Sequence, residues 1–204
     1  MKKIISLAVV LTLGFIGVSF AADGDLLVDD FEIVAVTTGP EGSVDFGAGN
    51  GSTVNVSAAT DIKNTGKQSL KVDFQAGNGG YIYVARGKGL DAKNANWPIK
   101  PEDIRWQEYK GFSFYIYGTD SKAKTAFDIK DNGDELWRFV VVDDFKGWKK
   151  VVCTFDKFIV RDDWQPATAD KNAKIDFPIK IFQFEPLPSS QGTLYFDTVE
   201  LVKK

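Results

Sequence analysis

The stretch GFSFYIY, residues 111–117, decides the fold class of this chain. Its apolar residues at 112, 114 and 116 alternate with a serine and two tyrosines. A period of two is typical of a β-strand with one buried face, whereas a helix would place apolar residues three or four apart. The segment Ala126–Asp131 repeats this alternation, with Phe127 and Ile129 as its apolar members. The pattern predicts an all-β protein.

Short segments of the same kind recur along the chain, and turn residues such as Asn132–Asp134 and Ser189–Gly192 separate them. A short helix is expected over Pro101–Glu108, with proline in its first turn. Many short antiparallel strands with one solvent-facing side predict a β-sandwich of the jelly-roll type, with a closed barrel as the alternative. The expected strands are Leu26–Val36, Thr53–Ser57, Ser69–Gln75, Gly80–Ala85, Gly111–Tyr117, Ala126–Asp131, Leu136–Val142, Lys149–Phe155, Ile179–Phe184 and Thr193–Val202.

Residues 1–21 have the pattern of a secretory signal peptide. A basic start, MKK, precedes an apolar run over Ile4–Phe20, and Ser19 and Ala21 place small residues where a signal peptidase cleaves. A transmembrane anchor is the competing interpretation, but the run is short and no positively charged flank follows it. We therefore expect residues 22–204 to form one exported domain that is secreted, periplasmic or associated with the cell surface.

The composition excludes several functions. The chain has no histidine, which excludes catalytic triads and metal sites that depend on this residue. Without the predicted signal peptide, 23 basic residues face 28 acidic ones, so neither nucleic acid nor insertion into a membrane is expected. The single cysteine, Cys153, cannot form an intrachain disulfide, and its strand-like surroundings predict a small buried hydrophobic residue.

Five segments, in this order, resemble the family 11 carbohydrate-binding modules and their relatives among the galactose-binding-like jelly rolls. The resemblance extends from Leu27 to Val202. It implies a non-catalytic domain that binds a polysaccharide, with a β-glucan as the expected ligand. The segments are VDDFE (28–32), GKQSLKVDF (66–74), YKGFSFYIYG (109–118), FKGWKKVVCTFDKF (145–158) and LYFDTVEL (194–201).

The resemblance also implies a structural calcium site that joins the first strand, the loop before the SLKV strand and the last strand. The matching positions are Glu32 with its neighbour Asp30, the main-chain carbonyl of Lys67, and Asp197. Calcium takes several oxygen ligands, and such ligands from distant segments would hold the two ends of the domain together. Ordinary acidic residues at strand ends are the alternative, although an unpaired carboxylate inside the apolar last strand would be costly.

The segment VRDDWQP, Val160–Pro166, places a tryptophan among charged residues. From the residues alone, Trp164 is either a plug over the core or a ring that faces a partner. The resemblance favours the partner, because family members carry an Arg-X-Asp-Tyr-Gln-Pro segment in this place. It implies that Trp164 stacks on a sugar ring while Arg161 and Asp163 bind its hydroxyls.

The resemblance extends the sugar site to further strands and turns. It places Tyr81 on the concave face, and strand alternation puts Tyr83 on the same side. It also implies that Asp134 binds the glucan and that Phe184 supplies a stacking ring where the family has a tyrosine. From the residues alone, the two tyrosines equally fit a core-facing position, and Asp134 equally fits a turn.

Five other residues receive structural interpretations. The resemblance implies that Trp148, in the GWK segment, is a core residue. Trp106, like Trp97, is interpreted as a lid over the core or as a contact at the rim of the site. Arg138 and Asp128 are expected to face each other across neighbouring strands.

Two other functions compete with sugar binding. The pairs Asp143-Asp144 and Asp162-Asp163 invite comparison with a glycoside hydrolase, but adjacent strand residues point to opposite faces and cannot form a facing acid–base pair. The FKGWK segment, followed by an extended stretch with prolines, also resembles the flagellar filament sheath proteins of spirochaetes. A structural subunit that assembles with other surface proteins is therefore the second alternative.

Overall fold

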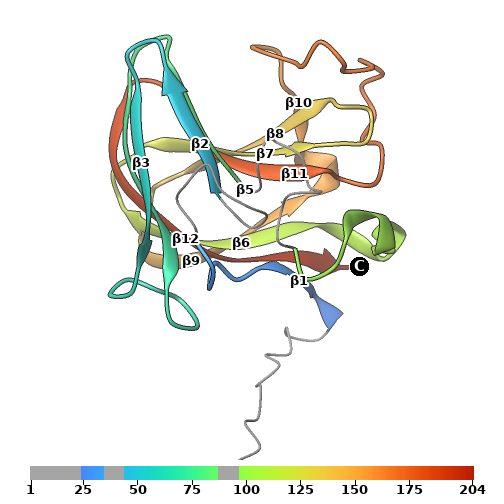
Figure 1. Cartoon of the computed structure of the whole chain (residues 1–204), viewed down its shortest axis with the longest axis horizontal. Coiled ribbons are helices and arrows are strands. Elements are labelled where there is room, and N and C mark those ends of the chain that lie inside the picture. The colour runs from blue at the N-terminus through green and yellow to red at the C-terminus, as the bar shows by residue number, and fades with distance from the viewer. Residues whose placement is uncertain (1–23, 35–43, 87–96) are drawn as a thin grey trace, which may run out of the picture.

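A computed structural model describes residues 24–34, 44–86 and 97–204, so the predicted signal peptide lies outside the described residues. In these described residues, twelve strands form two antiparallel sheets that pack face to face (Figure 1). This arrangement confirms the β-sandwich, and the closed barrel is wrong because the two sheets remain separate. In the described part of the chain, no helix has the length and apolar character needed to cross a membrane.

The first sheet is built around its long C-terminal strand, β12. Strands β4 and β1 pair with different halves of one edge of β12, and β6 pairs with the other edge. In β6, the apolar residues Phe112, Phe114 and Ile116 are buried, as the alternation predicts. The sheet comprises β1 (Leu26–Asp29), β3 (Thr53–Ala59), β4 (Ser69–Ala76), β6 (Tyr109–Thr119), β9 (Lys146–Thr154) and β12 (Ser190–Lys203).

The second sheet carries the candidate site. Its strands follow the spatial order β10-β8-β7-β11-β5-β2. The sequence predicted four of them within one or two residues but missed both edge strands, the two-residue β10 and β2, whose glycines weaken the strand pattern. The sheet comprises β2 (Val44–Gly49), β5 (Tyr81–Arg86), β7 (Lys124–Lys130), β8 (Leu136–Val142), β10 (Ile159–Val160) and β11 (Ile181–Pro186).

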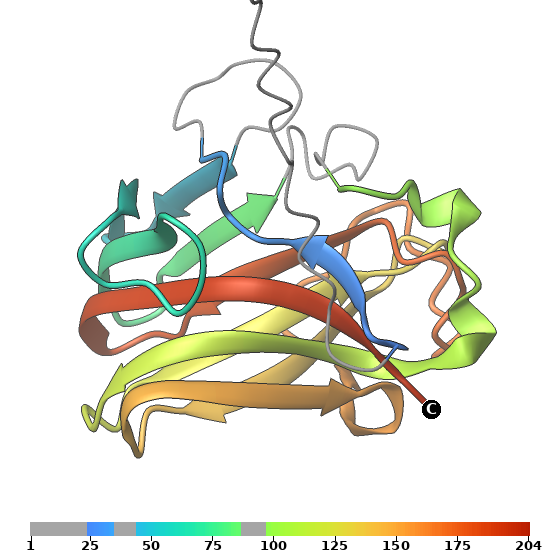
Figure 2. The same cartoon turned by 90° about the horizontal axis from the view of Figure 1, so that it is seen from below.

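Figure 2 looks onto the first sheet, with strands of the second sheet behind it. Phenylalanine side chains from both sheets fill the space between these two layers. Phe184 of the second sheet stacks on Phe196 of the first, with ring centroids 3.8 Å apart and an interplanar angle of 12°. Phe114 lies 4.9 Å from Phe127 across the same core. Cys153 is fully buried among these residues, as predicted, and burial raises the pKa of its thiol. The core therefore joins the sheets through aromatic packing.

The predicted helix over Pro101–Glu108 is instead a pair of 3-10 turns, Pro101–Asp103 and Trp106–Glu108. Ile104 between them is extended, which interrupts the helix. The indole N–H of Trp106 donates to the Pro101 carbonyl at 2.8 Å, so the segment folds around its tryptophan. Trp106, like Trp97, is buried and acts as a lid at the edge of the core.

Trp148 is not the core residue that the GWK segment implied. It lies half-buried on the outer face of the first sheet, where the strand register pairs it with Tyr117 and pairs Tyr117 with Tyr195. The ring centroids of Trp148 and Tyr117 are 5.5 Å apart, and those of Tyr117 and Tyr195 are 5.9 Å apart. Because Val151 and Cys153 of the same strand face the core, alternation turns Trp148 outward.

Candidate functional site

Two tyrosines form one side of the candidate site. Tyr81 and Tyr83 alternate along β5 with the buried Ile82, so both point to the outer face of the second sheet, and the core-facing alternative is wrong. Their cross-strand partners on β2 are Gly49 and Gly47, respectively. A Cβ at Gly49 would collide with the Tyr81 ring, and one at Gly47 would lie 2.8 Å from the Tyr83 hydroxyl. The glycines of β2 therefore provide the space in which the rings lie over the sheet.

Charged side chains occupy the middle of the same face. The register of the sheet aligns Gln183 of β11, Asp128 of β7 and Arg138 of β8 as direct neighbours. The predicted pair of Arg138 and Asp128 is confirmed, with Nε to Oδ1 and Nη2 to Oδ2 both at 2.8 Å. Nη2 of Arg138 also donates to Glu185 Oε2 at 2.8 Å. The guanidinium is thus held by carboxylates from two strands.

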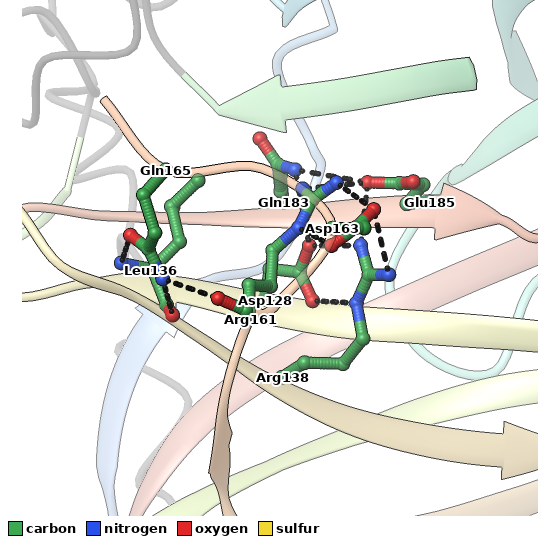
Figure 3. Close-up of polar contacts among 8 residues, drawn as sticks. All are labelled: Asp128, Leu136, Arg138, Arg161, Asp163, Gln165, Gln183 and Glu185. Atoms are coloured by element: carbon green, nitrogen blue, oxygen red, sulfur yellow. Dashed lines mark hydrogen bonds and ion pairs between the residues drawn. The ribbon is translucent and has the colours of Figure 1, made fainter. Parts of the chain in front are cut away.

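Arg161 adds a second guanidinium from the segment after β10, as Figure 3 shows. Its Nη1 donates to Asp128 Oδ2 at 3.1 Å and to Glu185 Oε2 at 2.9 Å. Its Nε and Nη2 form a two-pronged contact with the carboxylate of Asp163, at 2.9 and 2.8 Å. Arg161 therefore links the buried carboxylates to one that solvent reaches.

The two ends of this network titrate differently. Burial raises the pKa of Glu185 to about 7, against the lowering effect of the two arginines. The hydrogen bond from Arg161 lowers the pKa of Asp163 to about 2, although part of its surface is buried. Asp128, like Glu185, is buried, whereas Asp163 is exposed. Only Asp163 among the three carboxylates is therefore positioned to contact a ligand.

Trp164 follows this network, and 53% of its surface is exposed, so it is not a plug over the core. The guanidinium carbon of Arg161 lies 6.0 Å from the centroid of its ring. The side-chain amide of Gln165 pairs with the main chain of Leu136 as a neighbouring strand would. Its oxygen accepts the N–H of Leu136 at 2.8 Å, and its nitrogen donates to the Leu136 carbonyl at 2.9 Å. This pairing, visible in Figure 3, fixes the segment that carries the exposed ring.

Phe184 is a correction to the predicted site. Only 1% of its surface is exposed, and its ring stacks in the core on Phe196, so it cannot stack on a sugar. Alternation along β11 turns Phe184 inward and Gln183 and Glu185 outward. Gln183 and Glu185 were not predicted from the sequence as site residues, although their alternation with phenylalanines predicts that they lie on the outer face.

Asp134 lies in the turn between β7 and β8, with a positive φ of 64°. Its carboxylate forms an ion pair with Lys180 at 2.7 Å, and the hydrogen bond from Lys180 lowers its pKa. The structure therefore favours the turn interpretation from the sequence. A sugar contact by Asp134 stays a prediction.

The predicted calcium ligands Glu32 and Asp197 both reach the loop that precedes β4. Glu32 Oε1 accepts the N–H of Lys67 at 2.8 Å, and Asp197 Oδ2 accepts the N–H of Asn64 at 2.8 Å. The carboxylate of Asp30 is exposed and does not bond to this loop in the described residues. It accepts the N–H of Glu32 at 3.0 Å instead. Among the described residues, no three acidic, cysteine or histidine side chains form a group that could hold a metal ion. The calcium site, with Asp30, Glu32, Lys67 and Asp197 as its ligands, therefore stays a prediction.

The carboxylates of Asp143 and Asp144, one of the two pairs that invited comparison with a hydrolase, make separate contacts. Asp143 is buried and accepts the N–H groups of Thr119, Asp120 and Ser121 at 3.0 to 3.2 Å, which fixes the turn between β6 and β7. Its neighbour Asp144 instead pairs with Lys149 at 3.6 Å. Asp143 thus serves the turn, and Asp144 faces a lysine at the surface.

An exposed indole, two outward tyrosines and fixed charged groups on one sheet face define a class of protein, the β-sandwich domain that binds sugar chains. The model of a particular family, the carbohydrate binding domain of family 11, matches residues 18–204. The chain belongs to this family. Because it is a family of binding domains and not of enzymes, the glycoside hydrolase alternative is wrong.

Solved structures agree with this assignment. The family 11 module of the cellulosomal cellulase Lic26A-Cel5E of Clostridium thermocellum is 19% identical, with a TM-score of 0.67 over 90% of this chain and 97% of that one. The C. thermocellum family 11 module in complex with a β-1,3-1,4-mixed-linked tetrasaccharide is 20% identical, with a TM-score of 0.66 over 90% and 98%. A family 30 module of the C. thermocellum cellulase Cel9D-Cel44B is 13% identical, with a TM-score of 0.53 over 79% and 91%. No curated protein matches the chain.

Proposed function

We propose that this domain binds a β-glucan chain on the outer face of the second sheet, without catalysis. The observation that carries the proposal is the exposed Trp164 ring beside the fixed pair of Arg161 and Asp163, with Tyr81 and Tyr83 on the same face. The bound mixed-linked tetrasaccharide in the C. thermocellum family 11 module supports a β-glucan as the ligand.

The two kinds of group have separate tasks in this proposal. A pyranose ring presents an apolar face of C–H bonds, which the flat rings of Trp164 and Tyr81 cover by apolar contact. The exposed Asp163 accepts hydrogen bonds from sugar hydroxyls through lone pairs that Arg161 does not use. Because Arg161 holds Asp163 ionised, this acceptor keeps its charge over the physiological pH range.

Affinity electrophoresis in gels that contain barley β-glucan tests the proposal. The protein should be retarded by the glucan, and Trp164→Ala should migrate as it does in glucan-free gels. Trp148→Ala is the matched control, because this second tryptophan lies on the opposite sheet. If wild type and Trp164→Ala are retarded equally, the glucan does not bind at this face.

A structural calcium ion is the second part of the proposal. Glu32 and Asp197 would hold it together with main-chain oxygens of the loop that includes Lys67, and it would join both termini of the domain. Two observations support the fit: burial raises the pKa of Asp197, and its neighbour Thr198 has the strained φ of 45°. When bound, calcium would supply a positive charge that stabilises the buried carboxylate.

Thermal unfolding in calcium and in chelator tests this site. An ion that binds only the folded state at 100 times its Kd adds about 2.7 kcal/mol, which raises the Tm by several degrees. Glu32→Gln should remove the response, whereas the exposed Asp30→Asn should keep it. An unchanged Tm in chelator would show that no calcium ion stabilises the domain.

Export and assembly complete the proposal. The signal-like residues 1–21 support export, and the N-terminal sequence of the secreted chain would show cleavage after Ala21. The half-buried rings of Trp148, Tyr117 and Tyr195 on the first sheet are the feature that favours assembly with other surface proteins. Size-exclusion chromatography separates a monomeric glucan binder from a glucan-indifferent polymer, which would favour the sheath subunit.

A further inference from the structure

A groove of about 640 Å³ opens at one end of the sandwich, apart from the network of the second sheet. The 3-10 turns of residues 101–108 and the C-terminal end of β12 lie together at this end in both views (Figures 1 and 2). The groove is lined mainly by hydrophobic residues, among them the aromatic Trp106, Phe155 and Phe177. A smaller groove of about 410 Å³ shares Trp106 and Phe177 with it.

Phe177 forms a fixed, partly exposed platform in this groove. Its ring stacks on Trp106 with centroids 5.4 Å apart and an interplanar angle of 20°. The Phe155 ring packs on it edge to face, with centroids 5.1 Å apart and an interplanar angle of 73°. Trp106 itself is buried and hydrogen-bonded to Pro101. Although the rings of Trp106 and Phe155 pack against it, 41% of the surface of Phe177 is exposed. This exposed part of Phe177 is available to a ligand.

The charge around this platform is positive. Lys110, Lys174 and Lys204 line the groove, and none of them forms an ion pair with another residue that the structure describes. The one acidic side chain in the lining, Asp156, already pairs with Lys157 at 3.7 Å. Three unpaired ammonium groups around an apolar floor stand out in a chain whose net charge is −3. Charge complementarity therefore favours an anionic occupant.

We propose that this groove binds hexuronate residues of an acidic polysaccharide, separately from the β-glucan site. A hexuronate has the apolar ring face that Phe177 can cover and a carboxylate that a lysine can pair with. Its polymer repeats both features, so successive residues supply carboxylates to Lys110, Lys174 and Lys204. The groove volume lies within the range of ligand sites in proteins and exceeds what one sugar residue needs.

Other anions fit the groove less well. Phosphate and sulfate have no apolar face for Phe177, so they would leave the aromatic floor uncovered. A neutral glucan would cover the ring but leave the three lysines unpaired. An acidic peptide would satisfy the charges, but its flexible side chains offer no rigid apolar plate to the ring, and ordering them costs conformational entropy.

Isothermal titration calorimetry with short oligogalacturonates tests the proposal on the full mature chain. The double variant Lys110→Gln/Lys174→Gln should bind at least about tenfold more weakly, because each lysine contributes a charge-assisted hydrogen bond. Phe177→Ala should lose affinity to a similar extent. Binding should also weaken as sodium chloride rises from about 50 to about 500 mM. Lys146→Gln, an exposed lysine on β9 outside the groove, is the charge-matched control and should bind as wild type does.

The same variants, titrated with barley β-glucan, separate this site from the proposed glucan site. Trp164→Ala should no longer bind the glucan but should bind oligogalacturonate as wild type does. The double lysine variant should bind the glucan as wild type does but should bind oligogalacturonate more weakly. The absence of oligogalacturonate binding, or equal binding by the double lysine variant, would overturn the proposal while leaving glucan binding untouched. Displacement of oligogalacturonate by poly-glutamate at equal affinity would also overturn it, in favour of an acidic peptide ligand.

Discussion

Replacing Glu185 by glutamine tests the electrostatics of the second sheet, because this carboxyl group is buried between two arginines. Its Oε2 accepts from Arg138 at 2.8 Å and from Arg161 at 2.9 Å, yet burial raises its pKa from 4.5 to about 7. The folded protein therefore holds a proton on Glu185 under conditions in which the unfolded chain has released it. Such a difference makes the free energy of unfolding depend on pH.

The sign of this dependence follows from the raised pKa of Glu185. Its contribution to stability is fully present below the pKa of the unfolded state and is lost as the pH rises through about 7. Between pH 5 and pH 8, a shift from 4.5 to about 7 removes about 2.5 kcal/mol from the free energy of unfolding. Asp29, whose pKa burial raises to about 6, contributes with the same sign in wild type and variant alike.

Urea denaturation of wild type and Glu185→Gln at pH 5 and pH 8 measures this contribution. The wild type should lose stability over the interval, and the loss should be about 2.5 kcal/mol smaller in Glu185→Gln, which cannot titrate at this position. Asp162→Asn is the control, because Asp162 is exposed and its side chain takes part in none of the hydrogen bonds described above for Arg138 and Arg161. Equal pH dependence in wild type and Glu185→Gln would refute the assignment of the raised pKa to Glu185.

Three further changes probe the candidate site. Arg161→Ala should lower the free energy of unfolding in urea by about 3–5 kcal/mol, because it leaves Asp128 and Glu185 buried with a single guanidinium; a loss below about 1 kcal/mol would contradict the network. Trp164→Ala should weaken β-glucan binding at least about tenfold in calorimetry and cost less than the roughly 3–5 kcal/mol of emptying a buried aromatic site. Gly49→Ala should displace the Tyr81 ring and reduce glucan affinity, while a domain that binds as wild type does would show that this ring does not contact the glucan.

The strands of the core were predictable because alternation is local information. In β6, each apolar residue of GFSFYIY is buried, Tyr115 and Tyr117 are half-buried, and Ser113 is buried against the alternation. The strand β2 was missed for a nonlocal reason, because Gly47 and Gly49 leave space for tyrosine rings of β5. A glycine whose role depends on another strand gives no signal within its own segment.

The error at Phe184 came from transferring a ring by resemblance against the alternation of its own strand. In IFQFEP, Phe182 and Phe184 share one face, and Gln183 and Glu185 share the other, so the polar pair marks the outer face. Of the charged network on the second sheet, the sequence predicted the pair of Arg138 and Asp128 but not the place of Arg161. Arg138 and Asp128 lie on consecutive strands of a hairpin, whereas the position of Arg161 depends on how a later segment returns to β8.

That returning segment shows why an exposed tryptophan can be a rigid part of a binding site. The Gln165 amide and the N–H of Arg161 both bond to the main chain of Leu136, so the segment continues the edge of the sheet although it is not a regular strand. Pro166 has no N–H to extend the pairing, which ends it just after Trp164. A ring held in this way loses little conformational freedom when a ligand binds, and that saving adds directly to affinity. The buried Trp106 gives Phe177 the same support from behind, so both exposed rings are fixed before any ligand arrives.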